Sequence, residues 1–143
     1  MDDAADHEGW REWRGDGFMD LVGPVLIDDR GEVPRYALRA EARHLNAFGI
    51  VHGGVIMTFL DHVVGMNGSR FHDGIGQATI HLGVSFVTAV QAGSLIVAEC
   101  EVTRTTRSIL FLRGTARVDG TVVATAEGVW KITNRGKVSG QSF

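Results

Sequence analysis

Two adjacent glycines and one carboxylate on a single apolar segment are the residues of this sequence best suited to chemistry. Gly53 and Gly54 open the segment 55–64, which is apolar except for Thr58, Asp61 and His62. A segment that is apolar on all sides predicts a buried helix. An ionised carboxylate in such a helix costs several kcal/mol unless it is paired or faces a cleft. We therefore expect Asp61 to serve a reaction.

The start of this expected helix supplies the complementary group. Free N–H groups at a helix N-terminus favour negative charge, so the Gly53 N–H is the expected donor to a developing oxyanion. Asp61 lies seven residues after Gly54, which is ~10 Å along the axis. A general base must lie within ~3 Å of the water that it activates, so one helix cannot supply both groups. Two antiparallel helices could, which predicts a homodimer with the active site at the subunit interface.

The rest of the sequence predicts one antiparallel sheet curled around this helix. Six segments are typical of strands: 22–27, 36–42, 79–88, 95–104, 107–118 and 122–132. In the last four, apolar residues alternate with polar ones, and the even-numbered positions form the apolar face. Wrapping one sheet around one long helix is the simplest way to bury both. The predicted fold class is α+β.

The turn at Asp119-Gly120 predicts a bulge. A two-residue loop there would set even positions opposite odd ones, although both flanking strands place their even positions in the core. We expect a three-residue loop with Gly120 in the left-handed conformation.

Composition narrows the class of protein. The chain has 143 residues, of which 44% are hydrophobic, and a net charge of −3, which predicts a single domain over residues 1–143. Within residues 1–20, Trp10, Trp13 and Phe18 are spaced as in a short helix. Scattered basic residues and the lack of a long apolar run predict no binding to nucleic acid or membrane. An acidic N-terminus and a single cysteine, Cys100, favour a cytoplasmic location.

A longer motif surrounds the two glycines. It comprises His44, Asn46, Gly49, His52-Gly53-Gly54, Asp61 and Gly65, followed by Ser85-Phe86 and Ala92-Gly93. In these residues the chain resembles hotdog-fold thioesterases of the phenylacetic-acid-degradation type, also described as acyl-CoA thioesterase 13-like, from about Tyr36 to Ile132. The resemblance implies the hotdog fold, a homodimer often paired into a tetramer, and hydrolysis of an acyl- or aryl-CoA thioester.

The same resemblance implies roles for five residues. Asp61 would activate water or attack the carbonyl itself, and the Gly53 N–H would hold the thioester oxygen. Asn46 would position water or substrate, His52 would shape the turn or bond the carbonyl, and Thr79 would help to place the water. For each of them a purely structural role is the alternative.

Further substrate contacts are expected around this centre. Gly54 and His44 lie within the motif, and Arg104 and Arg107, in the turn between two predicted strands, are placed to meet the phosphates of coenzyme A. A solvated turn would explain these two arginines equally well.

Two other functions remain open at this point. One is a non-catalytic protein that binds or senses acyl-CoA, and the other is a hotdog enoyl-CoA hydratase. Asp61 favours the hydrolase, because a binding protein gains nothing from an unpaired carboxylate beside the acyl carbon. No cofactor is expected, and His44, His52 and His62 lack the spacing of metal ligands. His62 and His81 depart from the family pattern, and the sequence does not reveal the acyl group.

Overall fold

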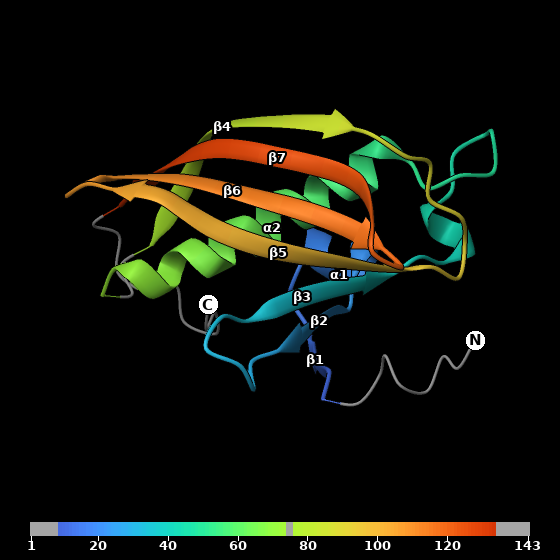
Figure 1. The fold of residues 1–143 in the computed structure, drawn as a ribbon, viewed down its shortest axis with the longest axis horizontal. Helices are drawn as coiled ribbons and strands as arrows, with labels where there is room; N and C mark the ends of the chain where they lie inside the picture. The colour runs from blue at the N-terminus through green and yellow to red at the C-terminus, as the bar shows by residue number, and fades with distance from the viewer. Residues whose placement is uncertain (1–8, 74–75, 134–143) are drawn as a thin grey trace.

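A seven-stranded antiparallel sheet curves around one long helix, α2 (Gly53–Gly68), in the computed structural model of the chain (Figure 1). The model describes residues 9–73 and 76–133. The strands follow one another across the sheet in the order β1 (Arg11–Trp13), β2 (Val25–Asp28), β3 (Arg35–Arg39), β5 (Leu95–Thr105), β6 (Ile109–Val118), β7 (Thr121–Ile132) and β4 (Gln77–Phe86). Three short helices, α1 (Phe18–Val22), η1 (Ala42–His44) and η2 (Ser69–Phe71), complete the described chain. This architecture confirms the predicted sheet around a central helix.

The core lies between α2 and the sheet face that it covers. Phe59, Leu60 and Val63 of α2 are fully buried, and each such side chain contributes about 1.5–3 kcal/mol by leaving water. The even-numbered positions of β5, β6 and β7 face them, as the alternation predicted; the most buried are Ile96, Ala98, Leu110, Leu112, Ala116, Ala124 and Trp130. Cys100 on β5 belongs to the same face and is also buried. None of the helices in the described ranges is long and apolar enough to cross a membrane.

The N-terminal segment is a strand where the sequence predicted a helix. Residues 11–13 pair antiparallel with β2, and the Trp13 ring packs on His62 of α2 with the ring centroids 4.5 Å apart. Pairing and ring contact outweigh the helix-like spacing of the aromatic residues, because so short a segment gains little from helix formation alone. A helix forms only at α1, and β1 is the strand that the sequence analysis missed. Residues 1–8 of the predicted helix lie outside the described residues.

The hairpin between β6 and β7 contains the expected bulge but a shorter loop than predicted. Asp119 and Gly120 alone form the loop, with φ of 48° and 79°, as in the type I′ turn that favours two-residue hairpins. The register shifts between Ala116 and Arg117. Ala116 pairs with Ala124 and Arg117 with Val122, so Val123 is the extra residue. The bulge therefore lies inside β7, where it reconciles a two-residue loop with two even-numbered core faces.

A second bulge, in β4, was not predicted. Thr79 pairs with Trp130 and His81 with Val129, so Ile80 has no partner on β7. Ile80 is 58% exposed instead of buried. An extra residue at a bulge reverses the alternation of side chains beyond it.

The β4 bulge decides which side chains reach α2. Thr79, before the bulge, bonds to a side chain of α2, while Leu82 and Val84, after it, pack against the core. Gly83 and Ser85 face the opposite side of the sheet, where they line a broad hollow. The predicted polar face that grouped Thr79 with Gly83 and Ser85 is therefore wrong at Thr79.

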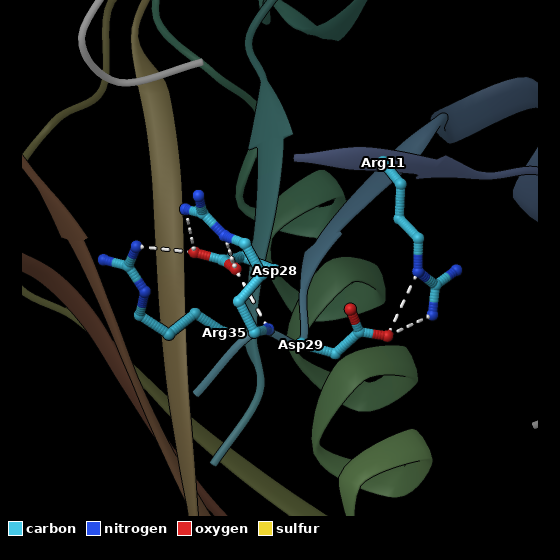
Figure 2. A network of polar contacts seen from close by, with 5 residues as sticks. Arg11, Asp28, Asp29 and Arg35 are labelled. Carbon is cyan, nitrogen blue, oxygen red and sulfur yellow. Dashed lines mark hydrogen bonds and ion pairs between the residues drawn. The ribbon is translucent and has the colours of Figure 1, made fainter. Parts of the chain in front are cut away.

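Charged groups hold the turn that follows β2 (Figure 2). Asp28, with a side chain only 8% exposed, accepts hydrogen bonds from Arg30 Nε at 2.9 Å and Arg35 Nη2 at 3.0 Å. Hydrogen bonds from Arg30 and then from Arg35 hold the pKa of Asp28 well below its ordinary value. Beside it, exposed Asp29 accepts from Arg11 Nη2 at 2.8 Å, which links the turn to β1. The turn after β2 is thus fixed by ion pairs.

Candidate active site

Asp61 lies on an exposed stripe along the first half of α2. Gly54 and Met57 are exposed, and Thr58 and Asp61 are half-buried, a spacing that places all four on one side of the helix. Residues 63–68, by contrast, are all buried. The prediction of a helix buried on every side is wrong for its first half, because the sheet packs against the opposite side there.

The Asp61 carboxylate is held by β4. Thr79 Oγ1 donates to Asp61 Oδ1 at 2.8 Å, since the bulge turns Thr79 toward α2. Among the residues that the structure describes, Oδ2 of Asp61 has no hydrogen-bond partner. One carboxylate oxygen is therefore fixed by a neutral donor, and the other is available to accept a proton or to attack a carbonyl.

His52 caps the N-terminus of α2. Its Nδ1 accepts a hydrogen bond from the Gly54 N–H at 2.8 Å, which satisfies one of the free donors of the first turn. A Cβ on Gly54 would lie 3.0 Å from that nitrogen, so the cap requires a very small residue. The Gly54 N–H is thus occupied within the chain, and His52 shapes the helix entry.

The Gly53 N–H remains open. No group in residues 9–73 or 76–133 accepts a hydrogen bond from it, and it lies at the positive end of a 16-residue helix. A cavity of about 240 Å³ adjoins Gly53 and is lined also by Asn46, Ile50 and Thr88. The Phe86 ring forms another wall, 3.2 Å from where a Cβ on Gly53 would lie. This open donor beside a cavity is the geometry that an oxyanion requires.

Asn46 forms the loop that leads into α2. Its Oδ1 accepts from the N–H groups of Phe48 at 2.9 Å and Ile50 at 3.4 Å. Asn46 also lines the cavity beside Gly53. Because its oxygen holds the loop, its amide nitrogen is the atom left to contact water or substrate in that cavity.

His44 serves the structure. It is buried, its Nδ1 accepts from the Glu41 N–H at 2.9 Å, and its Nε2 lies 2.8 Å from the Val22 carbonyl, to which it must donate. Both ring nitrogens are thus occupied by backbone groups of η1 and α1. A substrate contact of His44 stays a prediction, and its occupied ring nitrogens do not favour it.

The family follows from a comparison with known proteins. A family model described as the thioesterase superfamily matches residues 48–125, which is more than half of the chain. This chain belongs to the thioesterase superfamily. A search of curated proteins found no match.

Solved structures agree with this family. Zebrafish thioesterase superfamily member 2 is 20% identical, with a TM-score of 0.75 over 83% of this chain and 88% of the other. A putative thioesterase of Ralstonia eutropha JMP134, described as phenylacetic acid degradation-related, is 27% identical, with a TM-score of 0.66 over 90% and 88%. A mutant of the phenylacetic acid degradation protein PaaI from Thermus thermophilus is 18% identical, with a TM-score of 0.72 over 81% and 98%. These likenesses confirm the hotdog fold.

In this member of the thioesterase superfamily, one chain does not bring the predicted groups together. Asp61 and Gly53 are separated by two turns of α2, and Asp61 does not line the cavity beside Gly53. Arg104 and Arg107 are exposed in the hairpin between β5 and β6, at the end of the molecule where α2 finishes (Figure 1). Their contact with coenzyme A stays a prediction.

The other two histidines that the sequence analysis singled out, His62 and His81, lie in different surroundings. His62 packs on Trp13, and burial lowers the pKa of its imidazole. His81 is exposed. In the part of the chain that the structure describes, no three His, Cys, Asp or Glu side chains gather as metal ligands would.

The sequence analysis missed Gln77. Its Nε2 donates to the Gly65 carbonyl in the last part of α2, and its Oε1 lies 2.9 Å from His72 Nε2. The available signal was its position two residues before Thr79, which places both on one face of a strand.

Proposed function

We propose that this chain hydrolyses acyl- or aryl-CoA thioesters to a free acid and coenzyme A, at sites shared between two copies in a homodimer. Membership in the thioesterase superfamily supports the class of reaction. One observation carries the mechanism. A half-buried Asp61 and an open Gly53 N–H lie on one helix, ~12 Å apart along its axis, where a single substrate atom cannot meet both.

A two-fold axis near Met57 would bring these groups together. Met57 lies halfway between Gly53 and Asp61 along α2 and is 39% exposed. If two α2 helices crossed antiparallel at this level, Asp61 would lie beside the Gly53 N–H of the partner subunit. Each Met57 would then pack against its own copy and lose its contact with water. The same axis would produce two identical sites.

The exposed edge of β4 favours the same arrangement. Phe86 lies beside Gly53 and Thr79 beside Asp61, so β4 runs antiparallel to α2. An axis near Met57 therefore also crosses β4 near its middle. Phe86 and Ile80 are more than half exposed, which is costly for apolar side chains on an edge strand. Pairing two β4 edges would continue the sheet through the dimer and bury these side chains.

In this site Asp61 begins the reaction. Its free Oδ2 removes a proton from water while the water oxygen attacks the thioester carbon, or Oδ2 attacks that carbon directly. The Gly53 N–H of the partner subunit stabilises the negative oxygen of the tetrahedral intermediate. On the first route, the C–S bond breaks as the intermediate collapses, and the sulfur takes the proton that Asp61 removed from water. On the second route, collapse expels the coenzyme A thiolate and leaves an anhydride between the acyl group and Asp61. Water then hydrolyses this anhydride, which frees the acid and the Asp61 carboxylate, and a proton of that water passes to the thiolate. A thioester is already activated, so the proposal includes no metal or other cofactor.

The same proposal names the residues that contact the rest of the substrate, and it extends to the assembly and the location of the protein. Asn46 offers its amide nitrogen to water or substrate beside Gly53, and Arg104 and Arg107 meet the phosphates of coenzyme A. Two such dimers would pair into a tetramer. We place this activity in the cytoplasm.

A pair of substitutions at Gly53 tests the oxyanion donor. Gly53 is the first residue of α2, where proline is accepted, and His52 already has the extended backbone, with ψ of 134°, that a residue before proline needs. Gly53→Pro removes the N–H, and Gly53→Ala keeps it while adding the same Cβ beside Phe86. We expect kcat for coenzyme A release to fall by about 10²–10³ in the proline variant, and by far less in the alanine variant.

Mixing two inactive variants tests the shared site. In a dimer of Asp61→Asn and Gly53→Pro chains, one site carries both defects and the other carries neither. After random exchange of subunits, about a quarter of the wild-type activity should return. If activity fails to recover once subunit exchange has been demonstrated, the shared site is contradicted.

The substrates for these assays should be coenzyme A esters of graded chain length, together with phenylacetyl and benzoyl esters. Release of free thiol from any of them supports the hydrolase. Tight binding of such an ester without turnover would identify the acyl-CoA-binding alternative instead.

A further inference from the structure

Two side chains of β4 donate hydrogen bonds to α2. Thr79 donates to Asp61 at 2.8 Å, and Gln77, two residues earlier, donates to the carbonyl of Gly65, about one turn beyond Asp61. The two helix positions are ~6 Å apart along the axis, and the two strand positions are ~7 Å apart. The two hydrogen bonds are therefore spaced alike on the strand and on the helix.

The orientation of the Gln77 amide is determined by its partners. Because its Nε2 donates to the Gly65 carbonyl, its Oε1 must accept from His72 Nε2, at 2.9 Å. His72 therefore carries its proton on Nε2, and its buried Nδ1 has no partner among the described residues. A single amide thus joins the segment after α2 to the helix itself.

Gly65 makes this approach possible. A Cβ at that position would lie 3.3 Å from Gln77 Nε2 and 3.1 Å from Trp130 Nε1. The bulge at Ile80 contributes as well, because it lets Gln77 and Thr79 share the inner face with Leu82. Both Gly65 and the bulge therefore serve the contact between β4 and the end of α2.

We propose that Gln77 is a positioning residue for Asp61. Its amide, oriented by His72, holds the end of α2 in register with β4 and so keeps the Asp61 carboxylate within hydrogen-bond distance of Thr79. Gln77 touches neither Asp61 nor the substrate. This role rests on the proposed function, in which Asp61 carries out the reaction.

Replacing the amide tests the role. Gln77→Leu removes both of its hydrogen bonds and keeps a side chain of similar size. We expect kcat to fall about tenfold with KM changed less than about twofold, because substrate binding does not use this residue. His72→Phe, which removes only the orienting bond, should lower kcat by a smaller factor. Ser85→Ala, on the outer face of the same strand, is the matched control and should leave both constants unchanged.

A double variant separates positioning from general support of the fold. In a Thr79→Val background the positioned hydrogen bond is already absent, so Gln77→Leu should have little further effect on kcat. Equal fold-losses in both backgrounds, or a lower Tm with kcat unchanged, would overturn the positioning role. Should Gln77→Leu fail to fold, the same comparison is made with His72→Phe.

Asp61→Asn in the same assay distinguishes the two proposals. An inactive Asp61→Asn beside a fully active Gln77→Leu removes only the role of Gln77. An active Asp61→Asn removes the proposed mechanism and the role of Gln77 with it.

Discussion

Two carboxylates near the surface of this protein have opposite surroundings. Asp28, at the end of β2, is held by the guanidinium groups of Arg30 and Arg35 (Figure 2). Asp61, on α2, receives one hydrogen bond from the neutral hydroxyl of Thr79. Two cations more than balance the charge of Asp28, whereas a hydroxyl leaves the charge of Asp61 uncompensated. Under the proposed function, the first carboxylate serves the structure and the second serves the chemistry.

The largest expected effect is at the reactive carboxylate. Asp61→Asn should reduce hydrolysis of a responsive acyl-CoA by at least about a thousandfold, because an amide can neither accept the proton nor attack the carbonyl. The Tm should not fall, since the amide oxygen can still accept from Thr79. Thiol release and thermal unfolding measure the two quantities. Unchanged turnover would remove Asp61 from the mechanism.

A smaller effect is expected from the residue that holds Asp61. Thr79→Val replaces the hydroxyl by a methyl group, and we expect kcat to fall about ten- to a hundredfold, the usual worth of a hydrogen bond to a charged group. Valine is well suited to a strand, so the secondary structure should be retained in circular dichroism. A kcat equal to that of the wild type would show that Asp61 acts without this contact.

Asp28 should affect stability and leave kcat alone. Its pKa in the folded protein is lowered, chiefly by Arg30 and then by Arg35, so the folded state favours the ionised form. That contribution is complete above the unfolded pKa, near 3.8, and is lost as the pH falls further toward the folded pKa. The Tm of Asp28→Asn should therefore lie below that of the wild type at neutral pH, and the difference should shrink below about pH 4. A difference independent of pH would contradict this account.

The smallest effect is expected at Asp29, the residue that follows Asp28. Asp29 pairs with Arg11, and both side chains are more than half exposed, so water and salt screen the pair. Asp29→Asn should leave both the Tm and kcat at neutral pH without measurable change. A loss of stability as large as that of Asp28→Asn would show that burial is not what separates these neighbours.

Regular elements could be predicted from the sequence because their residues alternate without interruption. The inward faces of β5, β6 and β7 follow from apolar periodicity alone, and the start of α2 follows from the two glycines that open an apolar run. The extra residue at Ile80 could not, since a bulge depends on how β4 meets β7. Trp13 was misread for a similar reason, because its place is determined by contacts with β2 and His62, far along the chain.

The candidate site was predictable only where a residue carries a local anomaly. Asp61 is a charge in an apolar run, and Gly53 begins a helix, so both were evident. Gln77 is an ordinary polar residue in a strand. Its contact with α2 is evident only once the fold places the Gly65 carbonyl beside it. His44 lies within the motif, but only the fold shows that Val22 and Glu41 occupy its ring.

The burial of Cys100 has a practical consequence for these assays. It is the chain's single cysteine, and burial raises the pKa of its thiol to about 12, so almost no thiolate exists at neutral pH. Disulfide reagents should therefore report the coenzyme A set free and leave the native protein unlabelled. A cysteine engineered at Met57 would in turn be the one reactive point on the surface, where oxidative coupling of two chains would measure directly how near the helices approach.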